Sequence, residues 1–259
     1  MRPIWTGVIG FGLVNIPVKL YSATSTSNLD LDMLDKKDHS KIHFKRINEK
    51  TGKEVTWENI EKGYKMPNDE YVILTNKDFE LANSKKNKMI EITTFADEKE
   101  IESVYYETPY YLEPEESGVR AYALLRDALR KTKKVGVATF VLRNKETLAI
   151  IKATDTVIIL NRIRFEEEIR NPSELRLPAK TDIKSKELTM AVNLIEQLSG
   201  KFSIKHYKDT YRSELMKIIK AKSKGIKIKE PKLKVSYSKT KDLMAQLKAS
   251  LNANKKKAS

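Results

Sequence analysis

Apolar and polar positions alternate over many short stretches of the first 165 residues. In residues 15–21, Ile16, Val18 and Leu20 alternate with Asn15, Lys19 and Tyr21, which is the period of a half-buried strand. Pro17 cannot donate to a strand ladder, so we expect this strand at a sheet edge or bulge. Many short strands at close spacing favour a barrel or a sandwich over a parallel sheet. The other predicted strands are residues 41–47, 54–57, 71–75, 89–94, 104–106, 110–112, 135–143, 147–153 and 156–165.

One helical pattern interrupts these strands at residues 119–133. Ser117 is the predicted N-cap, and good helix formers follow it. Apolar positions recur with helical period at Tyr122, Leu125 and Leu129, so this stripe is predicted to pack on the core. The basic edge of the same helix is predicted to face a ligand.

From residue 184 the pattern becomes helical. Ser185 is a predicted N-cap for a helix that ends before Gly200, and a second helix is predicted over residues 208–222. We expect the two to form a pair packed on the barrel or on a second protomer. The predicted organisation is a core at 1–183, a helical pair at 184–223 and a tail at 224–259.

The tail begins with a lysine-rich linker over residues 224–239, which has no helical period and is expected to be extended. Thr240 is then a predicted cap for a short amphipathic helix over residues 240–252. A short helix on a tether cannot bury an apolar stripe alone. Its stripe therefore docks either in a groove on a partner or on its own domain, and the sequence leaves both open.

Charge is concentrated at the end of the chain. Residues 184–259 hold 20 basic and 6 acidic residues, a net charge of +14, whereas residues 1–183 hold 30 and 29, a net charge of +1. Such a basic end indicates nucleic acid or an anionic membrane surface as partner. No run of about 18 apolar residues could span a bilayer, and no signal peptide is recognisable, so a cytoplasmic location is expected.

The composition excludes several chemistries. The chain has no cysteine and three histidines, which excludes disulfides and thiol catalysis and makes a metal centre improbable. Gly7, Gly10 and Gly12 form no phosphate loop, because no Gly-Lys-Ser/Thr follows them. No catalytic motif is recognisable, so the chain is predicted not to be an enzyme and to need no cofactor.

The opening residues 1–22, MRPIWTGVIGFGLVNIPVKLYS, resemble the opening of the bacterial Ku proteins. The resemblance continues in the same order over nearly the whole chain. Its further segments are residues 38–40, 42–46, 61–64, 110–114, 122–130, 142–144, 168–170, 187–198 and 242–251.

This resemblance implies an α+β, mainly β fold: a Ku-core-like β-barrel with an extended arm, followed by C-terminal helices and a basic tail. It also implies a ring-shaped homodimer that binds double-stranded DNA ends in non-homologous end joining and recruits the ATP-dependent ligase D, in the cytoplasm at the nucleoid. Some relatives carry a Cys-x-x-Cys pair where this chain has Asn48 and Thr51, so a metal-bound turn is not expected here.

Candidate site residues follow from basic clusters in the neutral body and from the stripe of the tail helix. The candidate DNA contacts are Lys36, Lys37, Lys41, Lys45, Arg46, Arg126, Arg130, Lys133, Lys134, Arg143 and Lys145. The candidate ligase contacts are Leu243, Met244, Leu247 and Leu251. The main alternative is an architectural DNA-binding protein without preference for ends. An enzyme with a dispersed site and a membrane-surface role of the tail are further alternatives.

Overall fold

The computed structural model describes residues 1–258 except 27, 83–87, 179–182 and 227–242. The chain divides into two compact units. The first is built of Met1–Thr26 and Asp30–Asn171, and the second mainly of Pro172–Ser259.

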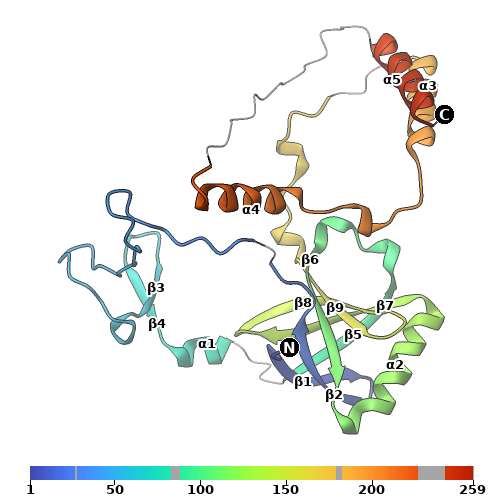
Figure 1. The fold of residues 1–259 in the computed structure, drawn as a ribbon. Helices are drawn as coiled ribbons and strands as arrows, with labels where there is room; N and C mark the ends of the chain where they lie inside the picture. The colour runs from blue at the N-terminus through green and yellow to red at the C-terminus, as the bar shows by residue number, and fades with distance from the viewer. Residues whose placement is uncertain (27, 83–87, 179–182, 227–242, 259) are drawn as a thin grey trace. The chain divides into compact units, whose positions relative to one another are not determined.

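The first unit contains a closed seven-stranded barrel (Figure 1). Its order around the barrel is β1 (Trp5–Phe11), β2 (Val14–Ser22), β6 (Tyr106–Pro114), β9 (Ile158–Ile163), β8 (Lys145–Ala153), β7 (Lys134–Leu142) and β5 (Met89–Asp97), which returns to β1. Only the closing pair of β1 and β5 is parallel among these pairs. Closure leaves no barrel strand with an unpaired edge. The sequence left a barrel and a sandwich open, and the structure is a barrel.

Strands β1 and β2 form a tight hairpin whose inward residues match the predicted alternation. Ile16, Val18 and Leu20 are fully buried. The two-residue turn between Phe11 and Val14 begins with Gly12 at φ +58°, a conformation in which a side chain would be strained.

The edge position predicted for Pro17 is wrong, because β2 pairs with β1 on one side and β6 on the other. The β6 ladder starts only at the pair Val18 and Pro114. Pro17 lies one residue beyond it, where its carbonyl accepts a hydrogen bond from Glu115 N at 2.9 Å. Its missing N–H therefore faces the end of the ladder and removes no strand-to-strand hydrogen bond.

Helix α2 (Val119–Thr132) packs on the barrel through Tyr122, Leu125 and Leu129, as predicted, and all three are buried. The N-cap is Gly118 instead of Ser117, and no side chain caps the helix. The Tyr122 hydroxyl donates to Leu112 O at 2.6 Å and accepts from Ile158 N at 2.7 Å. This one hydroxyl therefore joins the helix to β6 and to the start of β9.

The arm comprises the described residues between β2 and β5, and it adds nothing to the core. From residue 21 to residue 89 no described residue is buried. The arm contains a two-stranded sheet of β3 (Lys62–Lys65) and β4 (Tyr71–Leu74), followed by α1 (Asn76–Ala82). The sequence predicted β4 but neither β3 nor α1.

Three predicted strands are absent at their expected positions. Residues 41–47 and 54–57 form only the isolated bridges Leu34 with Lys41 and Ile47 with Glu54. Residues 103–105 form a 3-10 turn that leads into β6. Short polar segments without a core cannot extend a ladder by their alternation alone.

The arm contains the same turn twice, thirteen residues apart, starting at Asp35 and at Asn48. In each copy the first residue's side-chain oxygen accepts the N–H of the residue two positions on, at 2.8 and 3.0 Å. The carbonyl of Asp35 accepts the N–H of His39 at 2.8 Å, and that of Asn48 accepts the N–H of Gly52 at 2.9 Å. These two donors have positive φ angles of 60° and 66°. The N–H of Asp35 donates to the Ser40 carbonyl at 2.8 Å, and the N–H of Asn48 donates to the Lys53 carbonyl at 2.9 Å. Side-chain oxygens thus close both turns. The residues at these positions are Lys37, His39 and Ser40 in the first copy and Lys50, Gly52 and Lys53 in the second.

The second unit contains α3 (Ser185–Leu198), α4 (Thr210–Ser223) and α5 (Leu243–Ala258). Ser185 is the first helical residue of α3 and not its N-cap, which is Lys184. Asp209 caps α4 by accepting from Arg212 N at 3.1 Å. Helix α5 extends six residues beyond the predicted end, and its predicted cap Thr240 lies outside the described residues.

Helix α5 packs against α3 (Figure 1). The structure therefore shows the tail helix docked within its own unit, one of the two arrangements that the sequence left open. Among the described helices, none is long and apolar enough to cross a membrane.

Candidate nucleic-acid interface

Some of the predicted DNA contacts in the arm already bind a carboxylate or an aromatic ring, and others do not. Lys41 Nζ lies 2.7 Å from Asp32 Oδ1, and Lys45 Nζ lies 2.7 Å from Glu54 Oε2. The hydrogen bond from Lys45 to Glu54 raises the pKa of that lysine. The Arg46 guanidinium lies 4.0 Å above the Trp57 ring, a cation–π contact that orients it.

Lys36 and Lys37 occupy the first of the two repeated turns. Both are exposed, and neither forms an ion pair with another described residue. The turn holds their backbone while both ammonium groups remain in water. A phosphate could therefore bind them without displacing a carboxylate.

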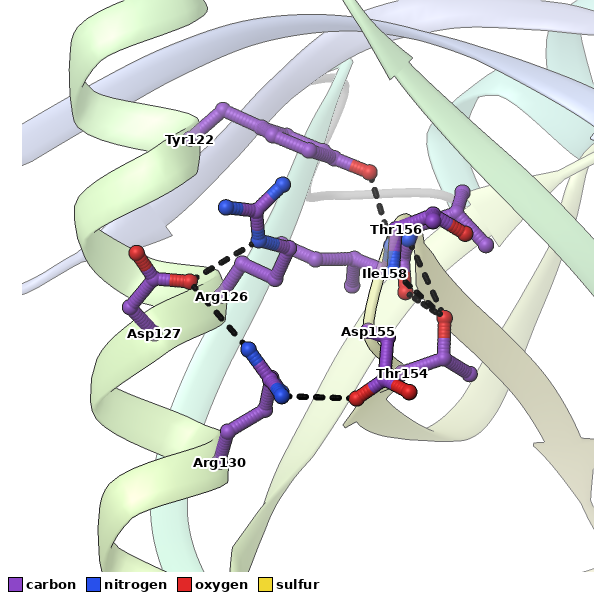
Figure 2. Close-up of polar contacts among 9 residues, drawn as sticks. Tyr122, Arg126, Asp127, Arg130, Thr154, Asp155, Thr156 and Ile158 are labelled. Carbon is purple, nitrogen blue, oxygen red and sulfur yellow. Dashed lines mark hydrogen bonds and ion pairs between the residues drawn. The ribbon is translucent and has the colours of Figure 1, made fainter.

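Helix α2 brings Arg126 and Arg130 together on one edge (Figure 2). Asp127 Oδ1 lies 3.0 Å from Arg126 Nε and 3.9 Å from Arg130 Nη1. Arg130 Nη2 also binds Asp155 Oδ1, in the turn between β8 and β9, at 2.6 Å. The bond from Arg126, followed by the charges of both arginines, lowers the pKa of Asp127. The pair is thus held in place by carboxylates that occupy part of its hydrogen-bonding capacity.

The remaining four candidates lie at the ends of β7 and in the β7–β8 turn. Lys134 pairs with Asp97 at 3.0 Å and Lys145 with Glu168 at 3.4 Å. Lys133 is an exposed left-handed residue that ends α2, and Arg143 is exposed in a two-residue turn in which both residues have positive φ. This is the geometry of a type I′ hairpin turn, which projects side chains away from the sheet.

Among the eleven candidates, Lys36, Lys37, Lys133 and Arg143 are exposed and have no ion pair or ring contact with another described residue. Arg46 lies on the Trp57 ring. The other six are paired with carboxylates, and surface pairs contribute only about 0–1 kcal/mol each. Phosphate could replace these carboxylates at little cost. The eleven candidates therefore include four immediate contacts, Arg46 on the Trp57 ring, and six cations that would exchange a carboxylate for phosphate on binding.

A hollow of about 780 Å³ lies beside Arg126, between α2 and strands β2 and β6. Tyr21, Tyr111 and Tyr122 line it together with Glu113. The hydrogen bond to Glu113 raises the pKa of Tyr21. Sequence reasoning assigned Tyr122 to the core-facing stripe of the helix and did not single out Tyr21 or Tyr111 for a site. The alternation along β6 indicates only that Tyr110 faces the core and Tyr111 faces away from it.

The predicted ligase contacts lie on α5. Met244, Leu247 and Leu251 are half-buried, while the Leu243 side chain lies outside the described part. Gln197 Nε2 of α3 donates to Leu251 O at 3.4 Å. No described group of three or more His, Cys, Asp or Glu residues is placed to hold a metal ion.

The closed, mostly antiparallel barrel, its packed helix and the coreless arm define a barrel-type protein with exposed cations on the arm and around α2. The family model "Ku: Ku70/Ku80 beta-barrel domain" matches residues 10–190, and the chain belongs to this Ku family. The matched region includes most of the barrel, the arm and α2.

Curated relatives are similar in sequence to this chain over most of its length. Proteins named "Non-homologous end joining protein Ku" are similar to it in three organisms. The Cupriavidus necator protein is 42% identical over 85% of this chain and 67% of its own length. The Archaeoglobus fulgidus protein is 38% identical over 98% and 100%, and the Coxiella burnetii protein 36% identical over 98% and 96%.

Proposed function

We propose that this chain binds the ends of double-stranded DNA, without regard to sequence, as a ring-shaped homodimer in non-homologous end joining. Its membership of the Ku family and the names of its relatives support this role. The structural observation that carries the proposal is the arm.

The arm exposes apolar side chains that its own chain does not cover. The two-stranded sheet leaves four such residues 48–63% exposed: Tyr64, Tyr71, Val72 and Ile73. Phe44 is 81% and Trp57 is 69% exposed. So many uncovered apolar groups in one segment indicate an interface. A second copy related by twofold symmetry supplies a matching surface.

A dimer with arms explains a preference for ends. A compact unit of about 180 residues has a radius of gyration near 16 Å, so it is comparable in size to the DNA duplex itself. One such unit does not encircle DNA, but two units joined through arms do. A closed ring has to be threaded from an end, and its contacts go to phosphates, which are the same for every sequence.

The test is a competition gel shift with a linear duplex, the same DNA as a closed circle, and a linear duplex blocked at both ends after protein loading. We expect the linear form to bind, the circle to compete poorly, and the blocked complex to survive a high-salt challenge. If the circle competes as well as linear DNA, the ring is wrong. The basic second unit would then support the architectural alternative.

We also propose that α5 recruits the ATP-dependent ligase D through Met244, Leu247 and Leu251, with Leu243. The support is the apolar stripe on a short helix that follows a lysine-rich segment. Deleting residues 241–259 should abolish stimulation of ligation and leave end binding intact. Loss of end binding in the deleted protein would instead give α5 a structural role.

A further inference from the structure

The stripe assigned to the ligase is already in contact with another helix of the same unit. Helices α3 and α5 pack side by side (Figure 1). On α5, Met244, Leu247 and Leu251 are half-buried, whereas the following residues of each turn, such as Lys248 and Asn252, are exposed. The spacing of three and four residues places the three half-buried side chains on one face of the helix.

Helix α3 shows the complementary pattern. Its half-buried residues are Glu187, Met190, Ala191 and Leu194, which again share one helical face. The opposite face of α3 remains exposed, with Ile195 at 65% and Val192 at 42%. Helix α3 therefore covers α5 with one face only.

The contact between the helices is specific but shallow. Gln197 Nε2 reaches Leu251 O at 3.4 Å, beside a hollow of about 470 Å³ lined by Asn193, Lys248 and Asn252 as well. None of the described stripe residues is fully buried. Such a contact holds α5 in place, but a partner helix or groove with a larger apolar surface could displace it.

We propose that α3 is an intramolecular cover for the ligase-binding stripe, so that the ligase and α3 compete for the same face of α5. This inference rests on the proposed recruitment of the ligase by α5. One helical face cannot contact both partners, so recruitment requires α5 to leave α3. If the uncovered form makes up about one tenth of the molecules, the measured affinity is about tenfold weaker than that of free α5.

The first experiment introduces a charge into the α3 side of the contact. The Leu194→Asp variant of the full chain should bind the cognate ligase about 3- to 10-fold more tightly in a binding titration, because it raises the uncovered fraction. The matched control is Ile195→Asp, the neighbouring position on the exposed face of the same helix, and it should leave the affinity unchanged. Circular dichroism checks that both variants keep their helix content. Unchanged or weaker binding by Leu194→Asp would overturn the proposal.

The second experiment links α3 to α5 covalently without changing any residue of the stripe. Because the chain has no cysteine, the pair Asn193→Cys and Asn252→Cys can be joined selectively by a short bis-maleimide across the hollow that both residues line. We expect the bridged protein to bind the ligase at least tenfold more weakly than the same variant capped with N-ethylmaleimide. Equal binding by the two forms would reject the cover.

The deletion of residues 241–259 separates the two possible failures. If the deleted chain binds the ligase as well as the intact chain, the stripe is not the docking site, and both proposals fail. If deletion abolishes binding but neither the charge nor the bridge changes it, the stripe recruits the ligase and only the cover is wrong.

Discussion

Tyr122 shows how one side chain fixes the helix on the barrel. Its hydroxyl is buried and serves both a carbonyl of β6 and an N–H at the start of β9. Burial is the main reason that the pKa of Tyr122 is raised, so the hydroxyl keeps its proton and can donate. The hydroxyl therefore joins the helix to two neighbouring strands of the barrel.

Replacing Tyr122 with Phe should lower the free energy of unfolding by about 1–3 kcal/mol, because two buried backbone groups lose their partner. Urea denaturation measures the change. Tyr21→Phe removes a hydroxyl whose partner is the exposed Glu113 carboxylate, and it should cost less than about 1 kcal/mol. Equal losses in the two variants would mean that the Tyr122 hydroxyl does not join the strands.

Asp127 is expected to affect DNA affinity through the two arginines that it contacts. Because its folded pKa lies below the ordinary value of 3.8, the carboxylate stays charged and holds both arginines throughout pH 5–8. Any stability from this ionisation is present above the unfolded pKa and is lost only as the pH falls through the folded pKa. DNA affinity should therefore show no titration of Asp127 near neutral pH.

Asp127→Asn should tighten binding to linear duplex about 2- to 10-fold at 100 mM salt, because Arg126 loses its carboxylate partner, Arg130 keeps only Asp155, and one repulsive charge is removed. Fluorescence anisotropy measures the affinity. Glu214→Gln removes a carboxylate paired with Lys217, which is outside the candidate set, and controls for net charge. If both variants bind equally tightly, the α2 edge has no special role.

At the scale of elements, the sequence predicts those strands and helices that bury one face in the core. The strands with buried alternating residues, such as β2 and β8, and the stripe of α2 are found as predicted, because burial of one face imposes the period. The arm has no core to impose a period. In the arm, the strand predicted at residues 41–47 is absent, and β3 and α1 were not predicted. That the turns at Asp35 and Asn48 repeat one another was not predicted, since the two residues match in hydrogen bonding and not in residue type.

The candidate site was predictable only in part for the same reason. Basic residues can be counted in a sequence, but their carboxylate partners cannot be assigned. Asp155 is 25 positions from Arg130, and Glu168 is 23 positions from Lys145. The fold decides which cations are already occupied.

Asn48→Ala should loosen the second repeated turn, because the amide oxygen accepts the N–H groups of Lys50 and Thr51. We expect faster hydrogen exchange at these two amides and a global loss below about 1 kcal/mol, since the arm has no buried core. Glu49→Ala, in the same turn, is the control. Unchanged exchange at Lys50 and Thr51 would show that the amide does not close the turn.

At the scale of the whole molecule, the arm is the proposed source of the dimer. Ile73→Asp places a charge on the exposed sheet of the arm and should yield monomers in analytical ultracentrifugation, with loss of the salt-resistant complex on end-blocked DNA. Leu124→Asp, on the exposed side of α2, should leave the dimer intact. A dimeric Ile73→Asp protein would place the interface elsewhere.

The way in which the repeated turns are closed has a consequence under oxidative stress. Peroxide and hypochlorite break DNA, and they also oxidise thiolates and release the metals that thiolates bind. This chain has no thiol, and an amide and a carboxylate close its turns. The hydrogen bonds that close these two turns should therefore persist in the same chemical conditions that create DNA ends.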